Sequence, residues 1–280
     1  PVPIVNIQKE ESRLGGASNV ANNIVSLGGH SLLCGVIGHD LFGKEIERIS
    51  RHKNIDTFLL KTSSPTITKA RIIGGKQQIV RVDYEDKSEL NADNKKLFRD
   101  TISRILPEYD ILVISDYGKG LISEDLCRYL IKLAHKYDKK VIIDPKGKNW
   151  EKYSGADIVT PNVKELSDIV GYTVPNTDRA IEKAAREAIT NNHLTALLVT
   201  RSDKGMSLIG PIPPIHIPTH SEEVFDVSGA GDTVVATLGL CLAAGFEISE
   251  AMRTANIAAG IVVKKVGTAT LTIEELVQQK

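Results

Sequence analysis

The sequence predicts an α/β fold in which a mostly parallel sheet is covered by helices on both faces. From about residue 110 onward, short runs rich in Val and Ile alternate with amphipathic segments, which is typical of parallel strands connected by helices. Before that point, polar and apolar residues alternate on both sides of Gly74-Gly75. Two glycines between alternating runs favour a hairpin. We therefore expect a small antiparallel patch beside the main sheet.

The residues before position 110 predict elements of both kinds. A helix, a strand and a second helix are expected at 17–27, 31–37 and 40–53. Alternating runs then predict the strands of the antiparallel patch at 57–61, 66–74 and 77–84. Because such a patch is half exposed, it can serve as a lid beside the main sheet or as a surface for a second copy of the chain.

The remaining residues predict the main sheet and its helices. The strands are expected at 111–115, 141–144, 157–160 and 196–200. The helices are expected at 123–137, 163–170, 177–190, 229–244 and 247–265. No repeat, low-complexity segment or linker interrupts this order, so the pattern predicts a single domain over residues 1–280.

The composition excludes several classes of function. Lys plus Arg (35) equals Asp plus Glu (35), so no overall field attracts nucleic acid or an anionic membrane. No apolar run approaches the roughly 18 residues that span a bilayer, and no signal peptide is recognised. Cys34, Cys127 and Cys241 lie far apart in apolar stretches, as expected for reduced thiols in the cytoplasm. Because the chain begins with Pro1, we expect a further segment before it.

The segment DVSGAGD, from Asp226 to Asp232, carries the most chemistry. Gly229 and Gly231 allow the backbone to turn tightly and to approach a ligand closely. The helix that follows leaves its first N–H groups unpaired, and with the helix dipole they form an anion site. Asp232 would stand beside them, where a carboxylate can accept the proton of a substrate hydroxyl during phosphoryl transfer. The alternative is that the glycines permit close helix packing and Asp232 caps the helix.

Asn162-Val163-Lys164-Glu165 follows the predicted strand at 157–160. An Asn and a Glu at this spacing lie on one face of the first helical turn. That turn is expected at the sheet edge where α/β proteins bind ligands. A glutamate there can hold Mg²⁺ through water, because Mg²⁺ keeps most of its hydration shell. A helix cap formed by the same two side chains is the alternative.

Two turns at strand ends carry weaker signals. The turn from Thr200 to Gly205 can present backbone amides and the Arg201 side chain to nucleotide phosphates. Its alternative is a plain hairpin turn. Lys146, in the turn after 141–144, places a cation where a phosphate could bind. Its alternative is a solvated lysine.

Near the start of the chain, Gly15-Gly16 opens a predicted helix. The two glycines let a substrate approach the backbone. Asn19 offers both donor and acceptor groups to the hydroxyls of a sugar. The alternative is an ordinary helix start capped by Ser18.

GGASN, TPNVKE and DVSGAGD, in this order, resemble the ribokinase-like carbohydrate kinases, also called the PfkB family. The resemblance covers essentially the whole chain, and DVSGAGDTVVA is its most specific segment. It implies a ribokinase-like three-layer α/β/α fold with a small antiparallel β lid, to which about residues 1–7 and 55–84 contribute. It also implies ATP as the phosphoryl donor, Mg²⁺, and K⁺ as a monovalent cation.

The resemblance implies roles at matching positions. Asp232 would be the catalytic base, with the amides of Gly229, Ala230 and Gly231 as its anion hole. The expected nucleotide-binding residues, with Arg201 added from the turn, are Asn162, Val163, Lys164, Glu165, Thr200, Arg201, Gly205 and Asn256. Glu165 would hold Mg²⁺ through water, and Asp226, near the backbone of Ser228 and Gly267, a monovalent cation. The expected substrate-binding residues are Gly15, Gly16, Asn19, Arg81 and Lys146, the last two for a substrate phosphate.

Within the family, the segments at 1–5, 65–72, 77–85, 115–120, 144–147 and 199–208 are similar to one subfamily. These kinases phosphorylate the anomeric hydroxyl of D-glycero-β-D-manno-heptose 7-phosphate, forming the 1,7-bisphosphate for lipopolysaccharide core synthesis through ADP-heptose. In some organisms they are fused to a nucleotidyltransferase. The alternatives are a fructokinase, ribokinase or nucleoside kinase, or a non-catalytic relative that binds nucleotide and sugar.

This chain departs from the family's pattern at one point, and the resemblance does not decide its oligomeric state. The family normally begins with a strand that carries a sugar-binding Asp, and nothing before PVPIV supplies it here. The predicted patch at 55–84 favours a homodimer, although a lid within one chain gives the same pattern. Partners are therefore expected to be ATP, a phosphorylated sugar and a second copy of the chain, without nucleic acid or membrane.

Overall fold

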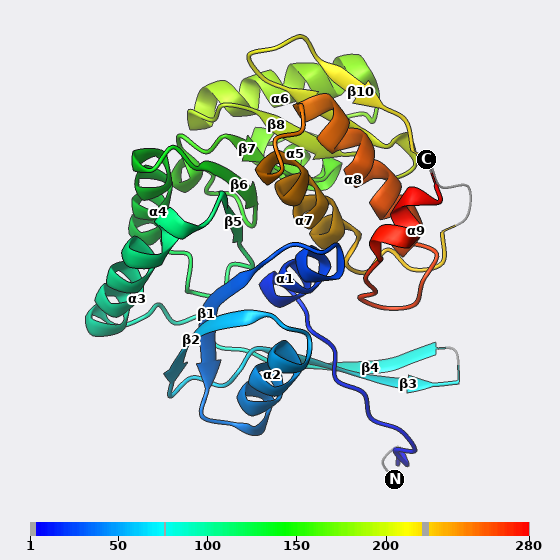
Figure 1. Cartoon of the computed structure of the whole chain (residues 1–280). Helices are drawn as coiled ribbons and strands as arrows, with labels where there is room; N and C mark the ends of the chain where they lie inside the picture. The colour runs from blue at the N-terminus through cyan, green and yellow to red at the C-terminus, as the bar shows by residue number, and fades with distance from the viewer. Residues whose placement is uncertain (1–3, 76, 220–223, 280) are drawn as a thin grey trace.

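The computed structural model describes residues 4–75, 77–219 and 224–279. Its largest sheet has the strand order β10-β9-β8-β7-β6-β5 (Figure 1). Strands β5 to β8 pair in parallel, whereas β9 and β10 add antiparallel strands at one edge. The strands are β5 (Ile111–Ser115), β6 (Lys140–Asp144), β7 (Ile158–Val159), β8 (Leu197–Thr200), β9 (Met206–Ile209) and β10 (Ile215–Ile217).

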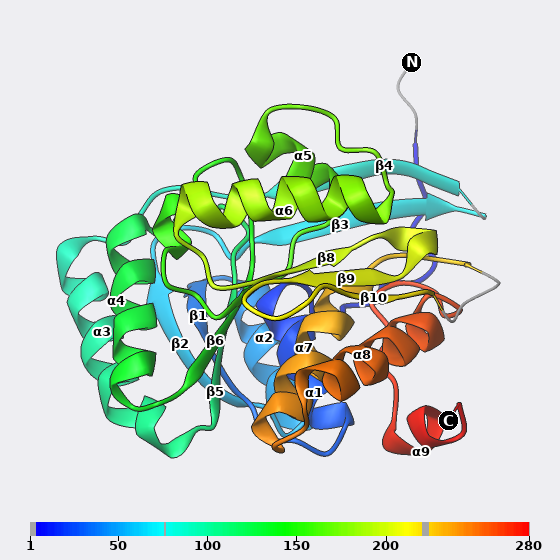
Figure 2. The ribbon, with the colours of Figure 1, turned by 90° about the horizontal axis from the view of Figure 1, so that it is seen from above.

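Helices cover both faces of this sheet (Figure 2). Because side chains alternate along a strand, Val141 and Ile143 pack into one hydrophobic core while Ile142 packs into the other. The first core is closed by α3 (Ala92–Ile105), α4 (Glu124–Lys136), α5 (Val163–Val170) and α6 (Asp178–Asn192). The second is closed by α1 (Ala17–Ser26), α7 (Ala230–Ala243) and α8 (Ile248–Val262). The predicted three-layer α/β/α architecture is therefore confirmed.

A smaller parallel pair stands apart from the main sheet. Strands β1 (Leu32–Gly38) and β2 (Asp56–Thr62) pair in parallel over their whole length. The prediction that 57–61 joins an antiparallel patch is therefore wrong. The physical reason is α2 (Leu41–His52), because a helix between two strands supplies the crossover that parallel pairing requires.

The antiparallel patch consists of β3 (Thr68–Gly74) and β4 (Gln77–Tyr84). Gly75, with a φ of 63°, lies in the turn between them, as predicted. This two-stranded ribbon projects beyond the body of the domain (Figure 1). Of the segment 1–7 that was expected to contribute to a lid, residues 1–3 lie outside the described residues, and the described residues 4–7 form no strand.

Most other predicted elements agree with the structure to within a few residues. The sequence patterns missed α3, both antiparallel edge strands β9 and β10, and the last helix, α9 (Ile273–Val277). Short 3₁₀ helices lie between these elements, namely η1 (Leu106–Glu108), η2 (Glu151–Tyr153) and η3 (Ser202–Lys204). Within the described residues, no helix is both long and apolar enough to cross a membrane.

Gly205 generates a prediction about stability. It closes the turn between β8 and β9 with a φ of 77°, and a Cβ there would overlap the carbonyl oxygen of Ile217. Gly171, at the end of α5, has a φ of 79° but open space around it. We expect Gly205→Ala to lower the free energy of unfolding by about 3 kcal/mol or more, from backbone strain plus steric overlap.

Gly171→Ala is the control for a positive φ in open space: its ψ of 11° places it in the left-handed helical region, where a side chain costs about 1–2 kcal/mol. Gly205 has a ψ of −123°, outside that region, so its backbone strain and its steric overlap both add to the loss. Urea unfolding of both variants followed by circular dichroism measures the difference, and equal losses would contradict this account of the turn.

Candidate active site

The N-terminus of α7 lies at the centre of the candidate site. Gly229, the residue before the helix, adopts the left-handed conformation with a φ of 83°, and no side chain caps the helix there. A Cβ on Gly229 would lie 2.9 Å from Nδ2 of Asn19, so the close approach requires glycine. The first amides of an α-helix have no partner within the helix, although the amide of Ala230 donates to the carbonyl oxygen of Val227 at 3.2 Å. The amides of Gly229 and Gly231, with that of Ala230 between them, lie where an anion hole is expected.

Asp232 follows in the first turn of α7, and its side chain is buried. One carboxylate oxygen, Oδ2, accepts a hydrogen bond of 2.7 Å from Nδ2 of Asn19. The other, Oδ1, accepts one of 2.8 Å from the hydroxyl of Tyr117. Burial raises the pKa of Asp232 above its ordinary value, and these two donors oppose the rise. A buried carboxylate with oriented oxygens suits a general base.

The predicted sugar-site residues lie beside this carboxylate. Helix α1 begins after Gly16, whose φ is 58°, and a Cβ on Gly16 would lie 3.2 Å from the ring of Tyr117. Ser18 donates a hydrogen bond to the carbonyl oxygen of Gly15, 2.7 Å away. Asn19 is fully buried. The structure thus brings Gly15, Gly16 and Asn19 together with Asp232.

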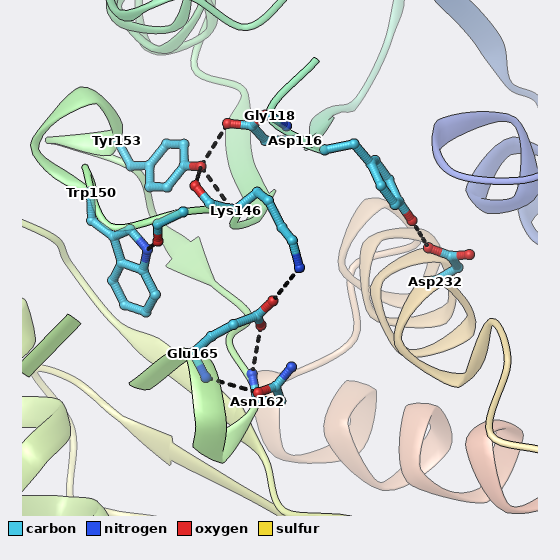
Figure 3. A network of polar contacts seen from close by, with 10 residues as sticks. Asp116, Gly118, Lys146, Trp150, Tyr153, Asn162, Glu165 and Asp232 are labelled. Carbon is cyan, nitrogen blue, oxygen red and sulfur yellow. Dashed lines mark hydrogen bonds and ion pairs between the residues drawn. The ribbon is translucent and has the colours of Figure 1, made fainter. Parts of the chain in front are cut away.

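The segment from Asn162 to Glu165 opens α5 and forms a capping box. Oδ1 of Asn162 accepts from the amide of Glu165 at 2.9 Å, and Oε2 of Glu165 accepts from the amide of Asn162 at 3.1 Å. The capping alternative is therefore correct as local structure. Oε1 of Glu165 is 3.2 Å from Nζ of Lys146 (Figure 3). Val163 and Lys164 occupy the same first turn.

Three groups at this sheet edge were not assigned a role from the sequence: Asp116 and Tyr117 after β5, and Asp144 at the end of β6. Burial, reinforced by the nearby carboxylates of Asp232 and Glu165, raises the pKa of Asp144 to about 8. The position after a strand was the available signal, because ligands bind at the carboxyl ends of parallel strands.

Asp116 anchors the turn that carries Tyr117. Its Oδ2 accepts a hydrogen bond of 2.7 Å from the hydroxyl of Tyr153 and also pairs with Lys152. Its Oδ1 accepts from the amide of Gly118 at 2.7 Å. The hydroxyl of Tyr153 in turn accepts from the amide of Lys146 at 3.0 Å. This network joins the ends of β5 and β6, as Figure 3 shows.

Three further residues predicted to bind the nucleotide are Thr200, Gly205 and Asn256. Thr200 forms an isolated parallel bridge with Asn162, so these two lie side by side. Nδ2 of Asn256 donates a hydrogen bond of 2.7 Å to the carbonyl oxygen of Pro218. Gly205 closes the turn after Thr200.

Arg201 does not present its charge to the sheet edge. Its side chain is 4% exposed and pairs with Asp178. It also donates to Oδ1 of Asn176 at 2.9 Å and to the hydroxyl of Ser207 at 2.8 Å. The guanidinium therefore fixes the turn from Thr200 to Gly205 against the loop before α6. The expectation that it faces nucleotide phosphates does not agree with this geometry.

Arg81 and Lys146 lie in different parts of the molecule. Arg81 is on the exposed strand β4, and its Nε pairs with Oδ1 of Asp83 at 2.8 Å. Lys146 lies at the sheet edge beside Glu165. Of the two predicted phosphate ligands, the structure thus places Lys146 within the cluster at the sheet edge.

The predicted cation ligands can be tested against the residues present. Glu165 belongs to an acidic edge with Asp144, whose pKa is raised by burial and by the carboxylates of Asp232, Glu165 and Asp116. Within the described residues, no three acidic, histidine or cysteine side chains converge to hold a metal ion directly, so this edge fits Mg²⁺ only as a hydrated ion held through water. Asp226 accepts from the amides of Ser228 at 2.9 Å and Gly267 at 2.8 Å. Hydrogen bonds from the Ser228 hydroxyl and from these two amides lower the pKa of Asp226, and a carboxylate that stays ionised suits a monovalent cation.

Solved structures with similar folds support the architecture. Phosphofructokinase-2 from Escherichia coli in complex with potassium aligns with a TM-score of 0.80 at 20% identity, covering 99% of this chain and 92% of that one. Arabidopsis thaliana ribokinase complexed with ribose and ATP aligns with a TM-score of 0.79 at 20% identity, covering 99% and 90%. The predicted ribokinase-like fold is confirmed.

Curated relatives are more similar in sequence. The bifunctional protein HldE of Haemophilus influenzae (strain PittEE) is 44% identical over 278 residues, which is 99% of this chain and 57% of that protein. HldE of Chromohalobacter salexigens is 45% identical over the same shares. The chain thus spans less than two thirds of the length of these relatives. A family model described as "pfkB family carbohydrate kinase" matches residues 2–275, and the chain therefore belongs to the PfkB family of carbohydrate kinases.

Proposed function

We propose that this chain is the ATP-dependent kinase of D-glycero-β-D-manno-heptose 7-phosphate, acting on the anomeric hydroxyl to form the 1,7-bisphosphate. The observation that carries the proposal is the 44–45% identity to bifunctional HldE proteins over nearly the whole chain. The product would enter the synthesis of ADP-heptose for the lipopolysaccharide core, in the cytoplasm. Because HldE is bifunctional, we also propose that the chain acts with a nucleotidyltransferase, fused or separate.

The chemistry is a direct in-line transfer with Asp232 as the general base. Its carboxylate takes the proton of the sugar hydroxyl as the new O–P bond forms and the bond from the γ-phosphorus to ADP breaks. The first amides of α7 stabilise the charge on the transferring group, because they are oriented before the reaction and sit in a partly buried site. Asn19 holds the carboxylate at 2.7 Å from the side opposite Tyr117.

Two cations complete this proposal. Mg²⁺, when bound, would neutralise phosphate charge at the acidic edge, with Glu165 holding it through water. K⁺, when bound at Asp226, would stabilise the loop that leads into α7, since Asp226 already ties Ser228 to Gly267. The solved structure of phosphofructokinase-2 with potassium supports the second role by analogy of fold alone.

Other members of the family remain the second candidates, namely a kinase of fructose, ribose or a nucleoside. A panel of these sugars with heptose 7-phosphate, assayed by coupled detection of ADP, separates the possibilities. We expect the highest kcat/KM for heptose 7-phosphate. A higher kcat/KM for a sugar from the panel would contradict the proposed substrate. Binding of ATP and sugar without release of ADP would favour the non-catalytic alternative.

The role of Asp232 as the base can be tested by substitution. Asp232→Asn keeps the shape of the side chain but removes its capacity to accept a proton. We expect kcat to fall at least ~10²-fold, the typical contribution of a general base, while the Kd of ATP changes less than about twofold. Asp138→Asn, in an exposed left-handed turn that asparagine also tolerates, is the control and keeps full activity. Near-normal turnover in the Asp232 variant would remove it from this role.

Lys146 is the proposed contact for the phosphate of the substrate. Lys146 is exposed at the sheet edge, so its charge can reach a phosphate 3 Å or so away. Lys146→Gln should raise the KM of heptose 7-phosphate about 10–100-fold, the size of a hydrogen bond to a charged group, with little change for heptose lacking the phosphate. Lys148→Gln, in the same exposed turn, is the control. An equal effect on both sugars would contradict the assignment.

For the oligomeric state, we propose a homodimer that forms through the β3–β4 ribbon. Ile73 and Ile79 are 63% and 59% exposed, and Val80, Val82 and Tyr84 on the same ribbon are also exposed. Apolar surface of this kind marks an interface. We expect a dimer in analytical ultracentrifugation at micromolar concentration and a monomer after Ile73→Glu, with Lys44→Glu on α2 as the charge control. A monomeric wild-type protein would contradict the proposal.

A further inference from the structure

We propose that Tyr117 is a positioning residue for phosphoryl transfer, whose hydroxyl orients the carboxylate of Asp232 and keeps it ionised. This inference rests on the proposed role of Asp232 as general base. It concerns a tyrosine that comes from the turn after β5, whereas Asp232 comes from α7 and Asn19 from α1. The side chains of Tyr117 and Asn19 thus reach the carboxylate of Asp232 from two different elements.

Each oxygen of the Asp232 carboxylate accepts a hydrogen bond from one of the two donors. Asn19 donates to Oδ2 at 2.7 Å and Tyr117 donates to Oδ1 at 2.8 Å. With one donor on each oxygen, rotation of the carboxylate about its Cβ–Cγ bond would break both bonds. Each oxygen still has a free lone pair, because an ionised carboxylate accepts about four hydrogen bonds. A sugar hydroxyl can therefore bind to an oxygen whose direction is already set.

Tyr117 is itself held in place from two directions. The preceding residue, Asp116, is 3% exposed and binds the amide of Gly118, the hydroxyl of Tyr153 and the ammonium group of Lys152. On the other side, the ring packs against the backbone of Gly16, where a Cβ would lie only 3.2 Å from the ring. A side chain fixed in this way loses little freedom when it holds another group.

The burial of Asp232 makes a donor to its carboxylate necessary. The titratable groups that face this cluster are Tyr117 and Asp144, and Asp144 itself senses Asp116, Glu165 and Lys146. Burial raises the pKa of Asp232, while the hydrogen bonds from Asn19 and Tyr117 lower it. Although 37% of Tyr117 is exposed, its hydroxyl lies inside the site against Asp232, where removal from water and the carboxylates of Asp232 and Asp144 raise the pKa of the phenol above its ordinary value. The phenol therefore keeps its proton and remains a donor at the pH values of the assay.

The test compares Tyr117→Phe with the wild-type protein and with Tyr172→Phe. Tyr172 is a matched control, because its hydroxyl also donates to a carboxylate, that of Glu187 at 3.0 Å, on the exposed surface. We expect Tyr117→Phe to lower the plateau of kcat about tenfold through loss of orientation. KM for sugar and ATP should change less than about twofold. Tyr172→Phe should change neither.

The pH dependence separates positioning from a general structural effect. A base with a raised pKa is active above that pKa, and its activity is lost as the pH falls through it. Removing the phenol destabilises the ionised form further, so the acid limb of kcat should move upward by about one pH unit. An unchanged limb, or a rise in the KM of the sugar alone, would overturn the positioning role.

A second measurement is independent of the substrate. The ¹³C carboxyl signal of Asp232, assigned by its absence in Asp232→Asn, can be titrated by NMR without any sugar. We expect its pKa to be about one pH unit higher in Tyr117→Phe than in the wild-type protein. If heptose 7-phosphate is not a substrate, the proposed function fails while this titration still decides the role of Tyr117. Equal pKa values in the two proteins would overturn it.

Discussion

The buried carboxylate of Asp232 is the group on which the rest of the site depends. It is removed from water at the start of a helix whose first amides favour negative charge. Burial alone would favour the protonated acid, which cannot act as a base. Two donors, Asn19 and Tyr117, counter this effect. Because Asn19 is 213 positions and Tyr117 115 positions away in the chain, the base exists only when three separate elements have packed together.

That packing is supplied by the hydrophobic core on one face of the main sheet. Val20 of α1 and Val234 of α7 belong to the same core as Ile142 of β6. The sheet thus sets where α1 and α7 lie, and their N-terminal ends then meet at its carboxyl edge. The polar contacts are added to a position that apolar burial has already established. The same edge collects Asp116, Asp144 and Glu165, so its excess negative charge has to be balanced by Lys146, Lys152 and any bound cation.

The motifs allowed the catalytic base to be predicted from the sequence, whereas most of the residues that hold this base in place could not be predicted. DVSGAGD locates a tight turn, a helix start and a carboxylate within seven residues, so local rules suffice for Asp232. Tyr117 has no local signal beyond its position after a strand, because its partner is far away in sequence. The pairing of β2 was predicted wrongly for a related reason. Its alternating pattern fits either orientation, and only the helix between it and β1 decides.

Arg201 and Glu165 show that a motif can locate a site correctly without revealing what each of its residues does. A charged residue in a ligand-binding turn is easily interpreted as a ligand contact, yet Arg201 is buried and bonds to Asn176, Asp178 and Ser207. Glu165 forms a helix cap with Asn162, but the cap does not exclude a role at the site. One oxygen caps the helix while the other faces Lys146. The cap fixes the direction of a carboxylate that would otherwise rotate freely. Local structure and chemistry therefore use the same residue, and the capping alternative becomes part of the explanation of the site.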